Sequence, residues 1–280
     1  PLYYLIVCSV VNIILDLLLI LVIPLGVLGA AIATLIAQAV SAVLVTVTLM
    51  YRTEGMKLCL SQIRMYKRML QSILKIGLPA GFEAIMYSIS NIIVQVSINN
   101  FGVDTMAAWT AYSKIDFIFW MINSAFGISV MTFVGQNYGA GKWDRIRRGT
   151  KICLGMALIS AVSVSIILMS AERFLFGIFV NDAGVVEIGI RMMNVIAPAY
   201  LLFAFIEVFS GALRAQGAVV VSTLITMVGI CVLRMIWVTL VAAHGTLEQV
   251  IICYPITWAA GALAMSIYYI YKQRKIFQAR

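Results

Sequence analysis

Apolar residues fill this chain in eight long stretches that short polar segments separate. About 20 apolar residues in a helix, at roughly 1.5 Å of rise each, match a bilayer hydrocarbon core of about 30 Å. The pattern predicts membrane-spanning helices at residues 2–23, 27–51, 73–100, 105–134, 152–170, 185–213, 219–243 and 248–271. The expected fold class is therefore an all-α, polytopic transmembrane helix bundle of eight helices. A content of 63% apolar and 11% charged residues agrees with this class.

Basic residues gather in alternate gaps between the predicted helices. The segment 52–75 holds six of them and the segment 142–151 holds five, and Arg214 and the C-terminal tail follow the same alternation. Loops rich in Lys and Arg stay on the cytoplasmic side of a membrane. We therefore expect these segments and the C-terminus to face the cytoplasm. The net charge of +9 lies mostly at this one face, where it favours anionic lipid, and we expect no nucleic-acid partner.

The predicted helices form two unequal groups. We expect the last two helices of an N-terminal lobe at 1–51, a basic cytoplasmic linker at 52–72, a complete six-helix C-terminal lobe at 73–271 and a cytoplasmic tail at 272–280. A weak repeat with a period of six helices supports two lobes, because the dipeptide at 15–16 has a loose counterpart at 233–234.

A stripe of polar side chains follows the predicted helix 73–100. Its members recur every fourth residue and are Glu83, Tyr87, Asn91, Gln95 and Asn99. This spacing brings them to one slowly winding face of a helix. Hydrocarbon does not tolerate such groups, so they face protein or a water-filled cavity. We favour a cavity that binds an ion or a substrate; the alternative is that the amides only hydrogen-bond neighbouring helices.

A second carboxyl, Glu207, lies on the predicted helix 185–213. Arg214 follows seven residues later on the same face, so we expect it to be the partner of Glu207. Glu83 and Glu207 lie at similar depth from the cytoplasmic ends of their helices, where two carboxyls can hold a cation or share a proton. The alternative is that each carboxyl is a structural partner of an arginine or an amide. Pro79 and Pro198 predict kinks in the same two helices.

Charged residues of both signs also lie in the outer half of the predicted spans. They are Asp16, Lys114, Asp116 and Arg234. Their comparable depth predicts a structural ion-pair network, and a gate closed by such pairs, with Arg214 as a further member, is the alternative.

The side chains that enzyme chemistry needs are sparse. The five cysteines have no metal-ligand spacing, and four of them lie in predicted helices, where they serve as small apolar residues. The one histidine, His244, lies at a helix end, so no histidine pair and no Ser/His/Asp set is available. We predict that the chain is not an enzyme and binds no cofactor.

Short motifs are distributed over the whole chain. They are NIILD at 12–16, GVLGAAIAT at 26–34, GLP at 77–79, VGQNYGAGK at 134–142, GALR at 211–214 and YPITW at 254–258. Together they resemble the multidrug and toxic compound extrusion (MATE) transporters, nearest their DinF-like bacterial branch. The segment 134–142 is the most specific match and is similar to the family's loop after its eighth helix. By this resemblance the chain covers helices five to twelve of a twelve-helix fold.

The resemblance implies a secondary active antiporter that exports organic, often cationic, compounds in exchange for Na⁺ or H⁺ by rocking of two lobes. It places acidic residues on the helices that carry Glu83 and Glu207, although both are displaced by about one turn from the family's positions. We expect Glu83, aided by Asn91 and Gln95, to bind the coupling ion or the cationic substrate. Glu207 assists. The expected setting is a multi-pass monomer in the bacterial inner (plasma) membrane, with the lipid bilayer and small organic substrates as partners.

Two other interpretations are open. A flippase for a lipid-linked saccharide would need a basic cavity, for which Lys114, Arg191 and Arg234 are available. A truncated, non-transporting product is the second, because one lobe and a third of another cannot enclose a cavity between lobes. Pro1 is not a translation start, and residue 2 already belongs to a hydrophobic stretch, so we expect further helices upstream.

Overall fold

The computed structural model describes residues 2–51, 58–59, 61, 63–241 and 245–278. Throughout these residues the regular structure is helical, without a strand, which confirms the all-α prediction. Four of the basic or titratable residues on which the predictions draw lie outside the described residues, namely Arg52, Lys57, His244 and Arg280.

Eight helical spans in the described part of the chain are long and apolar enough to cross a membrane, as the sequence predicts. They are Leu2–Val22, Gly26–Tyr51, Lys67–Asn99, Val103–Gly139, Trp143–Ser170, Ala183–Ala215, Val219–Val241 and Leu247–Ile276. The chain divides into two compact units, Pro1–Leu70 and Gln71–Arg280.

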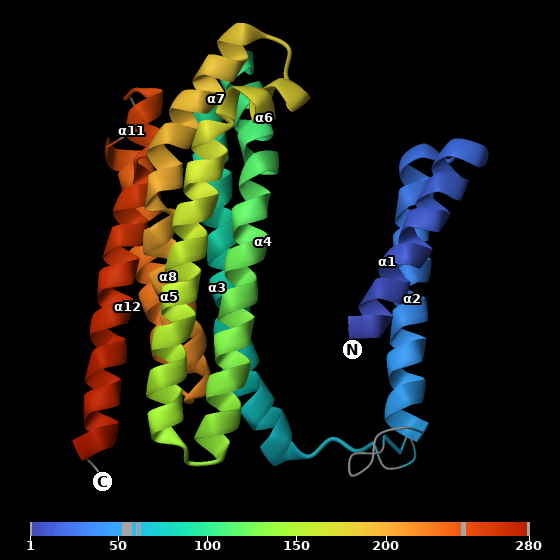
Figure 1. Ribbon diagram of the computed structural model, residues 1–280, viewed down its shortest axis with the longest axis vertical. Helices are drawn as coiled ribbons and strands as arrows, with labels where there is room; N and C mark the ends of the chain where they lie inside the picture. Colours follow the sequence, from blue (N-terminus) through green and yellow to red (C-terminus); the bar gives the residue numbers. More distant parts are fainter. Residues whose placement is uncertain (1, 52–57, 60, 62, 242–244, 279–280) are drawn as a thin grey trace. The chain divides into compact units, whose positions relative to one another are not determined.

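The N-terminal unit is a pair of helices (Figure 1). Its elements are α1 (Leu2–Asp16), the π-helical continuation η1 (Leu17–Val22) and α2 (Gly26–Tyr51). The buried residues of α2 are Gly29, Ala33 and Ala37, four residues apart on one face. Small residues at this spacing let two helix backbones approach closely within a membrane. A Cβ added at Gly29 would lie 2.8 Å from the carbonyl oxygen of Leu19, so the close approach requires glycine there.

The second unit is a bundle of long helices whose chain direction alternates (Figure 1). Its elements are α3 (Lys67–Asn99), α4 (Val103–Gly139), α5 (Trp143–Ser170), α6 (Glu172–Phe179), α7 (Ala183–Ile196), η3 (Ala197–Ala199), α8 (Tyr200–Ala215), α9 (Val219–Thr226), η4 (Met227–Val232), α10 (Leu233–Ile236), η5 (Trp237–Val241), α11 (Leu247–Ile251) and α12 (Cys253–Gln278). Most residues of α8 are buried, and this helix packs against α4, α5 and α12. Residues of α8 also line one of the cavities of the bundle.

Several helices, among them α3, α4 and α5, are longer than their apolar stretches predict. The segment 134–142 was expected to be a loop, but α4 continues to Gly139 and the turn occupies only 140–142, with Gly141 at φ +66°. The loop prediction was therefore wrong over 135–139. Similarly, α3 begins at Lys67, inside the predicted linker, and its first side chains are exposed as far as residue 78. Hydropathy reports only the part of a helix that lies in hydrocarbon, and a helix can continue beyond it because its backbone hydrogen bonds are internal.

The two prolines for which the sequence predicts helix kinks, Pro79 and Pro198, have different effects on their helices. Pro198, where a kink was predicted, lies in the 3₁₀ segment η3, which interrupts the α-helical geometry between α7 and α8. Pro79 lies inside α3 without ending it. Figure 1 shows the N-terminal part of α3 leaning away from the other helices of the second unit. At the C-terminus α12 extends to Gln278, so the described basic residues of the predicted tail belong to a helix.

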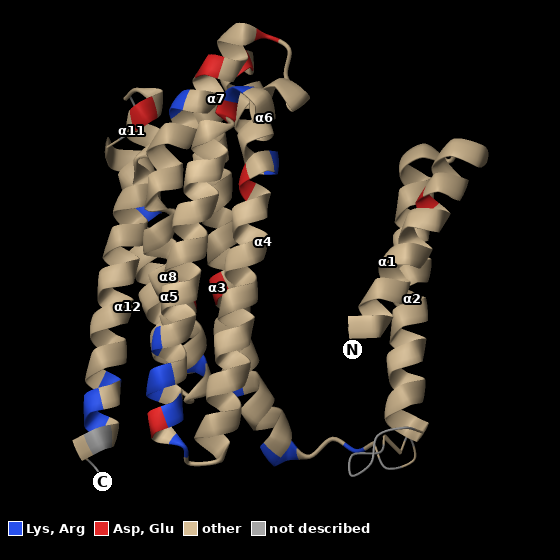
Figure 2. Cartoon of the chain, viewed as in Figure 1, with Lys and Arg blue, Asp and Glu red and all other residues tan. Residues whose placement is uncertain are grey.

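Charge is distributed unevenly along this bundle. Figure 2 shows Lys and Arg gathered at the end where α3 and α5 begin and α12 ends, whereas acidic residues lie mainly beside α6, α7 and α11. Within the second unit, the basic segments at the start of α5 and at the end of α12 thus lie at one end of the bundle.

Candidate functional site

Two cavities adjoin one face of α3. The smaller, of about 210 Å³, is called here the carboxyl cavity, and its lining includes Glu83, Tyr87, Asn123, Glu207, Ser210 and Arg214. The larger, of about 460 Å³, is called the aromatic cavity, and its lining includes Tyr87, Asn91, Trp109, Trp120, Arg234 and Trp258. Tyr87 and Trp120 line both, so the two cavities are neighbours.

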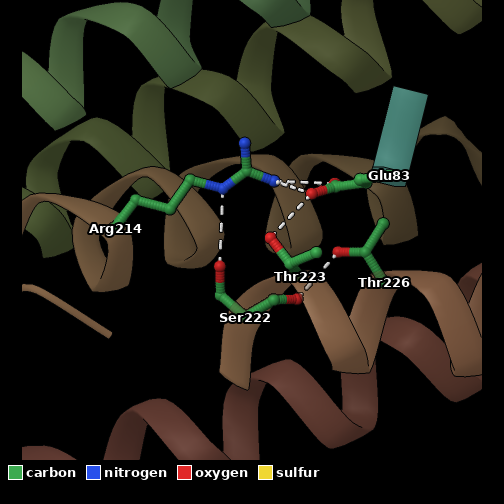
Figure 3. Close-up of polar contacts among 5 residues, drawn as sticks. All are labelled: Glu83, Arg214, Ser222, Thr223 and Thr226. Atoms are coloured by element: carbon green, nitrogen blue, oxygen red, sulfur yellow. Dashed lines mark hydrogen bonds and ion pairs between the residues drawn. The ribbon is translucent and has the colours of Figure 1, made fainter. Parts of the chain in front are cut away.

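Glu83, on α3, is held by side chains from two other helices (Figure 3). Nη2 of Arg214, at the end of α8, donates to both carboxylate oxygens of Glu83 at 2.7 Å. The hydroxyl of Thr223, on α9, donates to Oε2 at 3.0 Å. Glu83 is only 9% exposed. Hydrogen bonds between ionised groups are stronger than those between neutral ones, so this cluster fastens α3 to α8 and α9.

The expected pair of Arg214 and Glu207 is not formed, and that prediction was wrong. A spacing of seven residues separates the two positions by roughly 10 Å along one helix axis. Glu83 comes from a neighbouring helix and meets the guanidinium directly. Nε of Arg214 lies 3.4 Å from Oγ of Ser222, which further directs the arginine away from Glu207.

Glu207 lines the carboxyl cavity from α8. Within the described residues its carboxylate has neither a hydrogen-bond partner nor an ion-pair partner. Gly127, on α4, provides the space for it, because a Cβ added there would overlap Oε1 of Glu207. The carboxyl cavity is thus bordered by two carboxyls and one guanidinium.

The aromatic cavity holds one acidic and one basic side chain, but they do not pair. Asp116 accepts hydrogen bonds from the hydroxyl of Tyr200 and the indole N–H of Trp120. Nη1 of Arg234 donates to the amide oxygen of Asn91 at 3.1 Å. Each group therefore finds its partners among uncharged side chains.

Within the second unit, the expected ion pairs among Lys114, Asp116 and Arg234 are accordingly not formed. The ion pairs found there are Arg173–Glu187, Arg191–Glu248 and Arg214–Glu83. Lys114 is exposed on α4, and Asp16 belongs to the N-terminal unit. Neutral donors and acceptors lie closer to Asp116 and Arg234 than opposite charges do, and they satisfy part of each group's hydrogen-bonding capacity.

The polar stripe of α3 is divided between the two cavities. Glu83 and Tyr87 line the carboxyl cavity, whereas Tyr87, Asn91 and Gln95 line the aromatic cavity. Nε2 of Gln95 donates to the Asn99 amide oxygen at 2.8 Å. Asn99 itself lines neither cavity.

Several residues of the site escaped the sequence analysis. Thr223 and Ser222 lie in the seventh apolar stretch. Single hydroxyl residues are common in such stretches, so these two were not predicted as site residues. With Thr226 they form a polar face that a helical projection of this stretch would reveal. The role of Gly127 could not be predicted from the sequence, because it depends on the distance between α4 and α8.

These helices and cavities define a multi-pass α-helical membrane protein with ionisable groups inside its bundle, an arrangement typical of secondary transporters. A family model described as MatE matches residues 79–240. The chain belongs to the MatE family, and the resemblance seen in its motifs is confirmed. This family consists of transporters, so the prediction that the chain is not an enzyme is confirmed as well.

Individual relatives show the extent of the likeness. Probable multidrug resistance protein YoeA of Bacillus subtilis is 27% identical, over 99% of this chain and 62% of its own length. Multidrug export protein MepA of Staphylococcus saprophyticus is 25% identical, over 83% of this chain and 54% of its own length. The chain therefore spans less than two thirds of the length of either relative.

Solved structures agree on the fold. A MATE structure in complex with MaL6 matches with a TM-score of 0.90 at 18% identity, over 99% of this chain and 63% of that one. The outward-facing conformation of a multidrug resistance MATE family transporter matches with a TM-score of 0.89 at 19% identity, over 99% and 62%. The chain thus has the fold of part of a MATE transporter, over 62–63% of the length of these structures.

Proposed function

We propose that the protein is a secondary active multidrug efflux antiporter whose carboxyl cavity binds the coupling cation, Na⁺ or H⁺. Two relatives are named for multidrug resistance or multidrug export, and this chain aligns with 62% and 54% of their lengths. In this proposal organic compounds leave the cell through rocking of two lobes in the bacterial plasma membrane. The basic end of the bundle and the C-terminus face the cytoplasm.

The main support for this proposal is the excess of negative charge at the carboxyl cavity, which two carboxyls and one guanidinium border. Arg214 neutralises Glu83 through two contacts of 2.7 Å, whereas Glu207 borders the same cavity without a partner among the described residues. When both carboxyls are ionised, one negative charge has no counter-charge. An unpaired carboxylate is costly in a low-dielectric interior. Uptake of one cation at Glu207 removes that cost.

This cost also supplies a coupling mechanism. A cavity that holds a bound cation is neutral and can be enclosed, whereas the same cavity without the cation favours a conformation that admits water. The two lobe arrangements then bind the cation with different affinities, and a cation gradient shifts their populations. Glu83 and Arg214 keep their pair throughout and hold α3 in place beside Glu207.

Either cation fits the groups that are present. A proton needs only the carboxyl of Glu207. A sodium ion needs several oxygen ligands, and Asn123, Ser210 and Thr226, whose side chains each contain an oxygen atom, line the same cavity. Separate Na⁺ and H⁺ gradients distinguish the two possibilities.

The test is gradient-driven efflux of a cationic dye from vesicles that contain the protein. We expect Glu207→Gln to abolish the response to the gradient, because the amide is nearly isosteric but cannot bind a cation by charge. Glu187→Gln is the matched control, since Glu187 is 55% exposed and belongs to the surface pair with Arg173. Coupled efflux that survives in Glu207→Gln would refute the role of this carboxyl. Wild-type vesicles that respond to neither gradient would refute the antiporter itself.

A further inference from the structure

Arg234 is a buried cation that forms no ion pair within the described residues. The residue is 1% exposed and lies on α10, a short α-helical segment between the π-helical segments η4 and η5. Arginine remains protonated in proteins and has five N–H donors. Within the described residues Arg234 has no carboxylate within ion-pair distance, and its Nε lacks a hydrogen-bond partner. π-Helical segments interrupt helices often at functional sites.

The contacts of this guanidinium hold it in place without neutralising it. Nη1 donates to Asn91 at 3.1 Å, and the guanidinium carbon lies 4.2 Å from the ring centroid of Tyr254. A cation over an aromatic face is attracted to it, but the ring carries no net charge. The cost of burying a charge without a counter-ion is therefore offset only in part.

Two further side chains that line the same cavity carry a polar group without a partner. The indole N–H of Trp258 and the hydroxyl of Tyr87 are buried without a hydrogen-bond partner in the described residues, and both side chains line the aromatic cavity together with Arg234. An indole N–H and a guanidinium N–H can only donate. Buried polar groups in native proteins are nearly always satisfied. The complementary group is thus an acceptor, and beside Arg234 it is an anionic one.

The shape of the cavity indicates what carries that anionic group. The aromatic cavity has a volume of about 460 Å³. Its aromatic walls pack against one another, with ring centroids 5.4 Å apart for Trp109 and Tyr112 and 5.5 Å apart for Tyr254 and Trp258. Flat rings prefer offset-stacked or edge-to-face contact with other rings. The space between these walls is much larger than an inorganic anion, and the flat rings that line it suit an aromatic ring system.

Asp116 is the other charged group that faces this cavity. Its two carboxylate oxygens accept hydrogen bonds from Tyr200 and Trp120, so each oxygen already has a donor from the protein. By contrast, donors of Arg234, Trp258 and Tyr87 have no acceptor among the described residues. This imbalance favours an anionic ligand over a cationic one.

We propose that the aromatic cavity binds aromatic carboxylates, with the ligand's carboxylate on Arg234 and its ring between the tryptophan and tyrosine walls. As a substrate site this assignment rests on the proposed export function, and it adds organic anions to the cationic compounds expected from the family resemblance. In this proposal the neighbouring carboxyl cavity binds the coupling cation.

The test is a binding series in which one ring carries three different charges. The full chain in lipid nanodiscs is titrated with 1-naphthaleneacetate, its neutral amide and 1-naphthylmethylammonium, and quenching of tryptophan fluorescence reports binding. We expect the carboxylate to bind at least about 10-fold more tightly than the amide, because a hydrogen bond to a charged partner is stronger than one to a neutral partner. Equal binding of carboxylate and amide, or tighter binding of the ammonium compound, would overturn the proposal. This comparison needs no variant.

Variants then locate the site. Arg234→Gln should reduce the carboxylate-to-amide ratio to about 1, whereas Arg234→Lys, which keeps the charge, should retain a clear preference for the carboxylate. Arg191→Gln is the matched control, because Arg191 is 57% exposed and pairs with Glu248 at the surface. A ratio that is unchanged in Arg234→Gln, or lost equally in Arg191→Gln, would place the anion elsewhere and overturn the assignment.

Two further measurements distinguish this site from a site for small inorganic anions and from the transport activity itself. Replacing gluconate by chloride at constant ionic strength should leave naphthaleneacetate binding unchanged; displacement by chloride would show a site for small inorganic anions and overturn the proposal. Dye efflux under a cation gradient is measured on the same protein. Efflux without preferential carboxylate binding refutes the anion site alone, and carboxylate binding without efflux refutes the antiporter alone.

Discussion

Replacing Glu83 by Gln removes the charge that Arg214 contacts and keeps the size of the side chain. The Glu83 carboxylate accepts two hydrogen bonds from Arg214 at 2.7 Å and one from Thr223 at 3.0 Å. Removing one member of a fully buried ion pair costs about 3–5 kcal/mol. The Arg214 side chain is 29% exposed, so water compensates for part of the loss. We expect Glu83→Gln to lower the free energy of unfolding by about 2–3 kcal/mol.

A double-mutant cycle isolates the pair from the other contacts of Glu83. Glu83→Gln, Arg214→Gln and the double variant are unfolded by sodium dodecyl sulfate in mixed micelles and followed by circular dichroism. We expect a coupling energy of about 2 kcal/mol, because the two residues are in direct contact. The comparison is Arg191 and Glu248, whose side chains are 57% and 54% exposed and 3.6 Å apart. For this exposed pair we expect less than about 0.5 kcal/mol.

The result that would refute the reasoning is equality of the two cycles. Burial and the two short contacts of Arg214 would then contribute nothing beyond an exposed pair. A coupling energy near zero for Glu83 and Arg214 alone would show that Thr223 and the surrounding packing hold α3 without the ion pair.

Two further predictions concern space and exposure. Gly127→Ala should destabilise the protein by about 1–3 kcal/mol because the new methyl group overlaps Glu207. Gly135→Ala, in open space on the same helix, should be neutral or stabilising by up to about 1 kcal/mol, and equal losses in both would contradict this account. In micelles, maleimide should label the exposed Cys59 much faster than the buried Cys231, as mass spectrometry of single-cysteine variants can show; equal rates would contradict the burial.

Helix positions could be predicted well because the bilayer restricts the possible structures. Spanning segments must satisfy their backbone groups internally and expose apolar side chains, so long apolar stretches become helices. Helix ends were less predictable. The segment 135–139 is polar and glycine-containing, yet it continues α4, because outside hydrocarbon polarity no longer distinguishes helix from loop.

The polar stripe of α3 shows what the spacing of polar residues can predict and what it cannot. Its four-residue spacing indicates a common face, and four members line the two cavities. The spacing does not reveal which helix faces each residue. Glu83 meets Arg214 and Thr223, and Asn91 meets Arg234, through contacts between positions more than 130 residues apart in the sequence.

The sequence by itself indicated eight segments in this chain that are long and apolar enough to cross a membrane, a resemblance to a transporter family, and carboxyls within those segments. These properties follow from segment length, hydropathy and local motifs, which one stretch of chain expresses alone. Only the tertiary structure decided that Arg214 neutralises Glu83, that Glu207 is left open beside Gly127, and that Arg234 is buried without an ion pair within the described residues. Charge pairing acts over a few ångströms between helices, so it depends on how closely and in which rotation they pack, and neither can be read from one helix.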